Sequence, residues 1–129
     1  MSYAAIMYRV KPGHEDEIAE IFAGFQRMNT PVFTDDSGNE VGKLLGTAVF
    51  VKDDVVVRVI HYEGDFAAIG RHVGMQRGVH LIEDKLQPYL AQPRDTRNLV
   101  DFRTYFADAT MRSVSELTVD THPYSEQPR

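Results

Sequence analysis

The pattern of apolar and polar positions predicts a β-hairpin in the middle of the chain. Two apolar runs, residues 44–51 and 55–62, are separated by the polar tripeptide Lys-Asp-Asp at 52–54, which is typical of a turn between antiparallel strands. After the second run the apolar spacing changes from two residues to about three and a half, the period of a helix. The sequence therefore predicts a hairpin followed by a helix that bends near residues 74–78.

The residues before the hairpin predict a strand, a helix and a short ribbon. Residues 3–10 read as a strand with apolar side chains on both faces, which indicates that both faces are covered. Residues 14–28 have helical apolar spacing, and the acidic residues near their start suit the positive end of a helix dipole. Residues 32–33 and Val41 flank a turn-rich tip and are expected to form a short β-ribbon.

The residues after the hairpin helix predict one more helix and a closing strand. Residues 99–106 have the apolar spacing of a short helix, and residues 110–119 are expected to form the last strand. The order is then β-α-β-β-α-β with one extra helix, which is the arrangement of a ferredoxin-like α+β fold with a four-stranded antiparallel sheet. We expect a single domain over residues 1–119 and a flexible tail over residues 120–129.

The apolar residues on both faces of the expected strands also predict how the chain assembles. Two helices cover only one face of such a sheet, and monomers rarely expose a contiguous apolar patch of more than a few hundred Å². We therefore expect a symmetric homodimer in which the two sheets pack face to face, as in a dimeric α+β barrel.

Composition and charge exclude several classes of function. The 129-residue chain has a net charge of −5, and its 14 Lys and Arg residues are scattered, whereas nucleic-acid binding needs clustered basic residues. The absence of cysteine excludes disulfides, thiolate nucleophiles and cysteine-ligated metal sites. No apolar run approaches the roughly 18 residues of a membrane span, and the N-terminus lacks the pattern of a signal peptide. We expect a cytoplasmic protein with no membrane partner.

Three polar residues set into this apolar pattern are the candidates for catalysis. Arg58 shares a strand face with Val56 and Ile60, where a guanidinium needs a carboxylate, a carbonyl or an anionic ligand. It either pairs with a structural carboxylate or stabilises an enolate or phenolate oxygen. His72 borders the apolar face of the predicted helix and can exchange a proton near neutral pH, although a structural histidine bonded to a backbone carbonyl fits equally well. His61, near the end of its strand, is the weaker candidate.

Aromatic and methionine residues suggest an adaptable cavity for a flat aromatic ligand, with ordinary core packing as the alternative for most of them. The residues predicted to bind the ligand are Tyr8, Phe22, Phe25, Met28, Tyr62, Arg71 and Met75. The chain has none of the HExxH, Walker, GxGxxG or GxSxG motifs, and we expect neither a metal site nor a bound cofactor.

Three segments of the sequence resemble known families. Residues 49–95, VFVKDDVVVRVIHYEGDFAAIGRHVGMQRGVHLIEDKLQPYLAQPRD, and the later YFADATM resemble the SchA/CurD-like proteins of aromatic (type II) polyketide and spore-pigment gene clusters. The opening AAIMYRVKPGHEDEIAEIF is similar to the tetracenomycin-type polyketide cyclases, which are dimeric α+β barrels. The resemblance covers about residues 3–112. It departs from the cyclases at two positions, because Arg58 stands where they place a histidine on the hairpin and Phe25 falls near their first-helix histidine.

The resemblance implies action on poly-β-ketone or polycyclic aromatic intermediates. The first hypothesis is an aromatic polyketide cyclase that folds a poly-β-ketone for aldol closure, with His72 exchanging the proton and Arg58 or Arg71 stabilising the enolate. The second is a cofactor-independent monooxygenase, related to other α+β barrel monooxygenases, that oxidises a polycyclic intermediate. The third is a non-catalytic module that binds the polyketide or docks on a type II polyketide synthase.

Overall fold

The computed structural model describes residues 2–24, 32–35, 37–92, 94 and 98–117. Its centre is the predicted hairpin, in which β3 (Glu40–Lys52) pairs with β4 (Val55–Gly64). The strand β1 (Ser2–Arg9) pairs antiparallel with β4, and β2 (Val32–Thr34) pairs with β3 at the other edge. The result is a four-stranded antiparallel sheet of order β1-β4-β3-β2, which confirms the predicted ferredoxin-like α+β class and the short ribbon.

The prediction of a closing strand over residues 110–119 is wrong for the described part of that segment. Thr110 makes a single bridge to Ile6, and the Met111 N–H donates to the Ala5 carbonyl at 2.7 Å, but no strand follows as far as residue 117. Val114 is 85% exposed and Leu117 65% exposed, so the segment has no buried face that would stabilise a longer ladder. The fourth strand of the sheet is therefore β2. The predicted tail over residues 120–129 lies outside the described residues.

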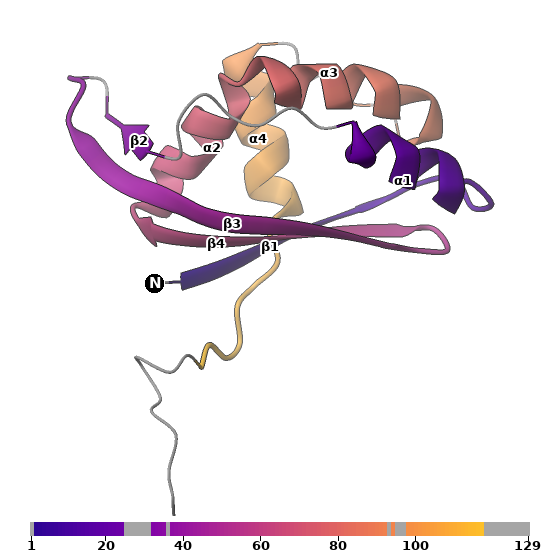
Figure 1. Ribbon diagram of the computed structural model, residues 1–129, viewed down its shortest axis with the longest axis horizontal. Helices are drawn as coiled ribbons and strands as arrows, with labels where there is room; N and C mark the ends of the chain where they lie inside the picture. Colours follow the sequence, from indigo (N-terminus) through magenta and orange to yellow (C-terminus); the bar gives the residue numbers. More distant parts are fainter. Residues whose placement is uncertain (1, 25–31, 36, 93, 95–97, 118–129) are drawn as a thin grey trace, which may run out of the picture.

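The helices all cover one face of the sheet (Figure 1). They are α1 (Glu15–Ala23), α2 (Phe66–Gly74), α3 (Arg77–Leu86), the short η1 (Gln87–Tyr89) and α4 (Leu99–Ala109). The predicted bend near residues 74–78 is a complete break between α2 and α3. The helix predicted over residues 14–28 ends at residue 23, and its last four positions lie outside the described residues. None of the helices in the described ranges has the length and hydrophobicity required to cross a bilayer.

Side-chain caps and one close packing contact hold the helices in place. The Asp65 carboxylate accepts the Ala67 N–H at the start of α2, and the Asn98 side chain accepts the Asp101 N–H at the start of α4. At the end of α2, a Cβ on Gly74 would lie 2.8 Å from the Phe102 ring, so the small residue lets α4 approach α2 closely. These contacts bring α4 over the sheet, where it completes the candidate site.

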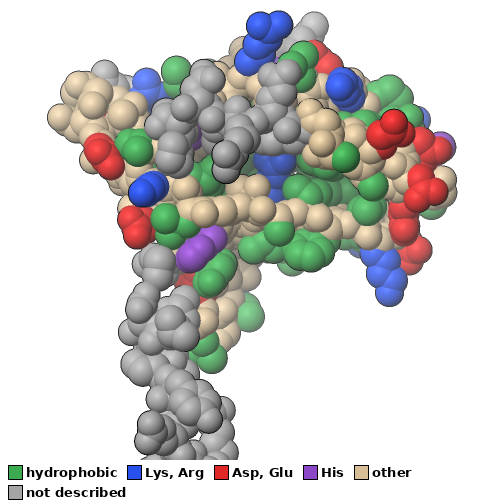
Figure 2. All heavy atoms as spheres, viewed as in Figure 1, with side chains coloured by type: hydrophobic (Ala, Val, Ile, Leu, Met, Phe, Trp, Pro, Cys, Tyr) green, Lys and Arg blue, Asp and Glu red, His purple; other side chains and the backbone are tan. Residues whose placement is uncertain are grey.

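The two faces of the sheet differ in their surroundings. On the inner face, Val56 and Ile60 of β4 are buried under the helices. On the outer face, Phe50 of β3 is 60% exposed beside the partly buried Val57, its pairing partner on β4. Figure 2 shows hydrophobic side chains gathered on the side of the sheet opposite the helices. The homodimer expected from this apolar outer face stays a prediction.

Candidate functional site

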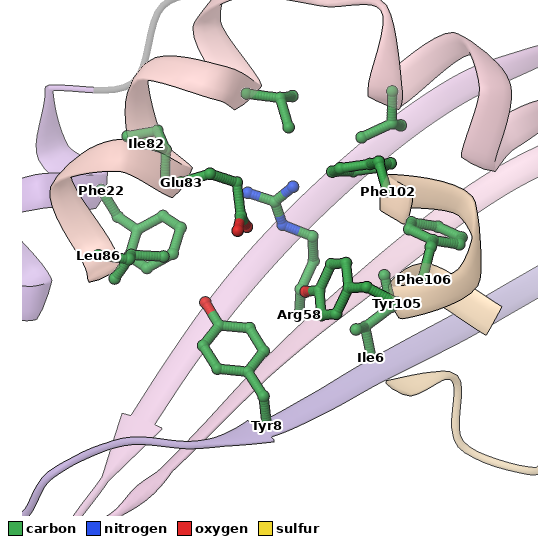
Figure 3. Close-up of a pocket in the computed structure, with 12 residues that line it drawn as sticks. Ile6, Tyr8, Phe22, Arg58, Ile82, Glu83, Leu86, Phe102, Tyr105 and Phe106 are labelled. Atoms are coloured by element: carbon green, nitrogen blue, oxygen red, sulfur yellow. The ribbon is translucent and has the colours of Figure 1, made fainter. Parts of the chain in front are cut away.

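A small cavity lies between the inner face of the sheet and the helices (Figure 3). Its volume is about 20 Å³, close to the space that one water molecule needs. Four polar side chains, Tyr8, Arg58, Glu83 and Tyr105, form part of its wall. The apolar residues that line the rest are Ile6, Phe22, Val73, Val79, Ile82, Leu86, Phe102 and Phe106.

The four polar side chains come from four different elements. Tyr8 belongs to β1, Arg58 to β4, Glu83 to α3 and Tyr105 to α4. The Arg58 guanidinium and the Glu83 carboxylate point toward one another across the cavity in Figure 3, with the two phenol groups beside them. The Tyr8 and Tyr105 rings meet edge to face, with their centroids 6.4 Å apart. Residues distant in the sequence thus form one polar cluster inside an apolar wall.

Arg94, which follows η1 in the chain, completes this cluster. Its Nη2 donates to Glu83 Oε1 at 2.9 Å and its Nε donates to Glu83 Oε2 at 3.1 Å, which is the bidentate geometry of a strong ion pair. Its guanidinium carbon lies 4.3 Å from the centroid of the Tyr8 ring and 3.8 Å from that of Tyr105. The Gln87 amide fixes the backbone here by donating to the Arg94 carbonyl at 2.7 Å.

Simple periodicity explains why two of these charged groups point inward. Arg58 alternates with Val56 and Ile60, which are fully buried, so the period of two places its side chain on the same face. Glu83 lies four residues after Val79 and three before Leu86, so it shares the buried face of α3. In both β4 and α3, burial of the apolar neighbours places the charged side chain on the face that packs into the core.

Burial makes the two tyrosine phenols weaker acids. Loss of solvent raises the pKa of Tyr8 to about 12, although the positive charge of Arg94 opposes part of that effect. Burial likewise raises the pKa of Tyr105 above its ordinary value. Burial alone would lower the pKa of Arg94, but its hydrogen bonds to Glu83 raise it. At neutral pH the cluster therefore holds two neutral phenols and a charged Arg94.

This arrangement suits an oxygen anion. Among the described residues of the cluster there are two guanidinium groups and one carboxylate, which leaves one excess positive charge in a poorly solvated place. The phenols of Tyr8 and Tyr105 are further hydrogen-bond donors, and such preorganised donors stabilise a developing negative charge. Glu83 supplies a carboxylate that can accept a proton. No group of three or more His, Asp or Glu side chains in the described ranges is arranged to hold a metal ion.

Comparison with known proteins agrees with the resemblance noted above. The family model described as the SchA/CurD like domain matches residues 1–119. The chain belongs to the SchA/CurD-like domain family. Among curated proteins, the chain is 37% identical over 110 residues to "Polyketide synthase CurD" of Streptomyces cyaneus, which covers 85% of the chain and 28% of that protein.

Two further relatives are also from Streptomyces. The SchA/CurD-like domain is 32% identical over 114 residues to the 42.8 kDa protein in the whiE locus of Streptomyces coelicolor, covering 88% of the chain and 27% of that protein. It is 32% identical over 110 residues to Protein SchA of Streptomyces halstedii, covering 85% of the chain and 27% of that protein. The chain therefore spans about a quarter of the length of the curated relatives it matches.

Three of the predicted site residues line the cavity of this SchA/CurD-like domain. They are Tyr8, Phe22 and Arg58, and the Arg58 guanidinium carbon lies 5.8 Å from the centroid of the Phe22 ring. Two others, Phe25 and Met28, lie outside the described residues.

The two candidate histidines are located elsewhere in the fold. The His72 ring lies against Phe33 of β2, with centroids 5.2 Å apart. The His61 ring is on the outer face of the sheet, stacked on Tyr3 at 4.5 Å. None of the described residues that line the cavity is a histidine. The catalytic roles of His61 and His72 stay predictions.

The remaining three predicted ligand contacts are also outside the cavity wall. Tyr62 packs against Phe66, with ring centroids 5.6 Å apart. Arg71 lines a separate shallow groove with Arg103. Met75 follows the end of α2 and is 62% exposed.

The sequence-based prediction missed Glu83, Arg94 and Tyr105. Two of them could have been predicted from the sequence, because each is a polar residue at a position of an otherwise apolar helical face. Glu83 falls in the stripe of α3 and Tyr105 in that of α4, at spacings of three and four residues from apolar neighbours. Arg94 follows no periodic pattern, and only the folded chain brings it to Glu83.

Proposed function

We propose that this domain acts in aromatic polyketide biosynthesis, where the cavity cluster promotes aldol cyclisation of a poly-β-ketone. One relative is named a polyketide synthase, which supports the pathway. The observation that carries the reaction is the cluster itself, in which guanidinium groups, neutral phenols and one carboxylate meet inside an apolar wall. A poly-β-ketone is a flexible, oxygen-rich chain that reacts through enolates, and groups of these kinds stabilise an enolate.

The reaction begins with loss of a proton from a methylene group between two carbonyls. In this proposal the Glu83 carboxylate takes the proton, and the electron pair of the broken C–H bond moves to the carbonyl oxygen as an enolate. Arg58 and Arg94 stabilise the enolate charge, and the phenols of Tyr8 and Tyr105 donate hydrogen bonds to it.

The second step closes the ring. The enolate carbon attacks a ketone carbon of the same chain, a C–C bond forms, and the carbonyl electron pair becomes an alkoxide. The proton held by Glu83 then returns to that alkoxide, so the step consumes no external oxidant or reductant. The cavity of about 20 Å³ has to open to admit the reacting part of the chain. Once it has opened, its apolar wall contributes by holding the two carbons in reacting geometry and by excluding water.

Product analysis tests this proposal. Purified protein is added to a minimal type II polyketide synthase reaction, and the products are compared by liquid chromatography and mass spectrometry. We expect a shift to one cyclised product with the wild type, a loss of at least about tenfold with Arg58→Met and with Glu83→Gln, and no change with Arg103→Met on the outer side of α4. A product profile identical with and without the protein would overturn the proposal.

The same assay distinguishes the other two hypotheses. Running it under air and under nitrogen separates cyclisation from oxygenation, because only a monooxygenase requires O₂. A product that forms only under air would replace the cyclase by a monooxygenase. A product shift that needs the protein but survives both cavity substitutions would indicate a binding module without catalytic groups.

A further inference from the structure

An open groove of about 840 Å³ lies on the outer edge of β1. It is bounded by β1, by the segment after η1 and by α4, and its wall includes Met7, Arg9, Thr104 and Asp108. Within the described part of the chain, the neighbouring segments pair with the edge of β1 only on either side of the groove. The Ala5 carbonyl accepts the Met111 N–H and the Arg9 carbonyl accepts the Ala91 N–H. Because residues 111–117 form no strand along β1, the described residues leave a gap at this edge of the sheet.

This groove and the inner cavity share two walls. Tyr8 and Tyr105 line both spaces, whereas Glu83 lines only the inner one and Arg94 only the groove. The Arg94 guanidinium, packed on both rings and bonded to Glu83, therefore forms the partition between them.

The two volumes show that the partition matters for binding. An inner cavity of about 20 Å³ has room for about one water molecule, whereas ligand pockets usually measure roughly 300 to 1,000 Å³. The groove falls within that range at about 840 Å³. A ligand of several rings can occupy the groove as it stands, but it reaches Arg58 and Glu83 only if the Arg94 guanidinium leaves its place.

We propose that the groove is the entry and binding site for an elongated, planar, oxygen-rich ligand, and that the ligand displaces the Arg94 guanidinium from between Tyr8 and Tyr105. The inference rests on the proposed function for the identity of that ligand, a polycyclic aromatic intermediate or product formed from a poly-β-ketone. A guanidinium is flat and stacks on aromatic rings, so the place that it leaves suits a flat conjugated ring. Once displaced, Arg94 stays in the groove, where it can bind a ligand oxygen.

The ligand's position follows from this exchange. Its leading ring stacks on one of the two tyrosines and contacts the other edge to face, since their planes lie at 65° to one another. The rest of the molecule remains in the groove beside Arg9 and Arg94. Short ligands of one ring would fill only the tyrosine site. Ligands of three or more fused or folded rings would fill both the tyrosine site and the groove. The domain should therefore bind longer ligands more tightly than ligands of one ring.

Binding kinetics of a non-reacting probe test the inference. The probe is 1,8-dihydroxyanthraquinone, a planar three-ring phenol, and its binding is followed by stopped-flow quenching of tyrosine fluorescence, since the chain has six tyrosines and no tryptophan. Arg94→Met alone would leave Glu83 without this partner, so the informative variant is the pair Glu83→Gln with Arg94→Met, compared with Glu83→Gln alone. We expect about a tenfold faster association in the double variant, because the site is then open before the ligand arrives.

Two matched variants complete the kinetic design. Arg94→Lys retains a charge toward Glu83 but lacks the flat fork, and should associate at a rate between those of the wild type and the double variant. Arg103→Met, outside the groove, should leave the rate unchanged. Association at the wild-type rate in the double variant, or no binding of the probe to any variant, would overturn the inference.

A crystal structure of the wild-type protein with the probe provides a readout that needs no variant. The inference expects the probe between Tyr8 and Tyr105 with Arg94 moved into the groove, and a complex in which Arg94 still bridges both rings would overturn it. Because the probe does not react, this result is independent of catalysis. Probe binding as expected with unchanged polyketide products would contradict the proposed function alone, whereas changed products with no displacement of Arg94 would contradict this inference alone.

Discussion

Removing one member of the Glu83–Arg94 pair should destabilise the domain strongly. The side chains are only 9% and 14% exposed, and two hydrogen bonds of 2.9 and 3.1 Å join them. Breaking a buried ion pair from one side typically costs about 3 to 5 kcal/mol, because the remaining charge keeps its desolvation penalty. The Arg58 guanidinium also faces Glu83, so we expect the lower end, about 3 kcal/mol, for Arg94→Met.

A double-mutant cycle isolates the interaction between the two side chains. Glu83→Gln removes the charge that Arg94→Met would leave behind, so the double variant should lose less free energy of unfolding than the sum of the single variants. We expect a coupling energy of about 2 kcal/mol. Urea unfolding followed by circular dichroism measures each value, with equal slopes confirming that the compactness of the unfolded state is unchanged.

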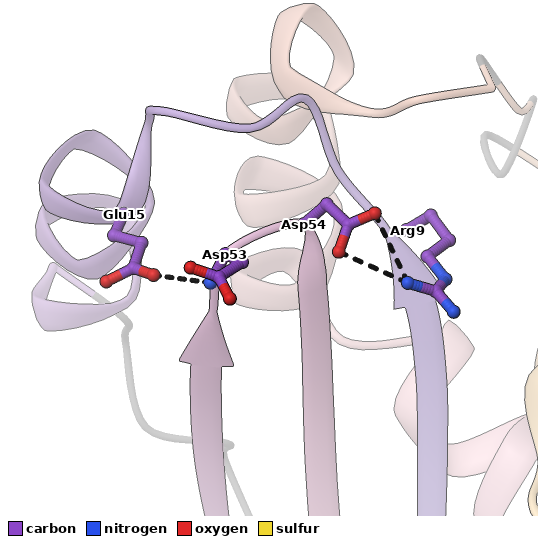
Figure 4. Close-up of polar contacts among 4 residues, drawn as sticks. All are labelled: Arg9, Glu15, Asp53 and Asp54. Atoms are coloured by element: carbon purple, nitrogen blue, oxygen red, sulfur yellow. Dashed lines mark hydrogen bonds and ion pairs between the residues drawn. The ribbon is translucent and has the colours of Figure 1, made fainter.

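The chain contains an exposed ion pair that serves as the control. Arg9 Nη1 lies 3.2 Å from Asp54 Oδ1 at the end of the hairpin (Figure 4), and these side chains are 57% and 47% exposed. Exposed pairs contribute at most about 1 kcal/mol, so the same cycle on Arg9 and Asp54 should give a small coupling energy. Additive effects at Glu83 and Arg94, within about 0.5 kcal/mol, would refute the argument that burial makes that pair strong.

Three further predictions address protonation, catalysis and assembly. Because the folded state raises the pKa of Tyr8 from 10.0 to about 12, the unfolded chain loses this proton first, and the free energy of unfolding should fall by up to about 3 kcal/mol as the pH rises through that interval. Urea unfolding at alkaline pH should show a smaller fall for Tyr8→Phe than for the wild type, and an equal fall would contradict the raised pKa of Tyr8. In the polyketide assay, Glu83→Gln should lose the cyclised product while His72→Ala retains it; loss in His72→Ala alone would place the base on α2, as the sequence predicted. Light scattering should give about twice the chain mass of 14.6 kDa, and Phe50→Asp on the outer face should lower it to the monomer value, whereas a wild-type monomer would rule out the dimer.

Local periodicity determined much of the fold. The apolar run over residues 55–62 predicted the hairpin strand, and the period of two predicted that Arg58 shares a face with Val56 and Ile60, because neighbouring side chains of a strand point to opposite faces. The change to helical spacing after residue 64 predicted a helix that bends near residues 74–78, where the structure has a complete break between α2 and α3. These features depend on residues close together in the chain, which is why the sequence alone reveals them.

The tertiary structure decided which segment forms the fourth strand at the edge of the sheet. Residues 110–117 pair with β1 at little more than Thr110, whereas Val32–Thr34 adds to β3, so a different segment supplies the fourth strand. Strand pairing depends on which partner buries an apolar face, and Val114 and Leu117 bury none here. The resulting gap beside Met7 is the groove through which we propose that the ligand enters.

The candidate site was likewise decided by contacts between distant residues. The sequence by itself determined that Arg58 shares a strand face with Val56 and Ile60, and that Tyr8 shares one with Ile6 and Val10, since each follows the strand period. The packing of the helices made these the inner face of the sheet. Only the packing of α3 and α4 over that face brings Glu83 and Tyr105 to them, and only the path of the chain after η1 brings Arg94 to Glu83. Which side chain meets another across the core depends on how whole helices and strands pack, and the residue spacing within one helix or strand does not determine that packing.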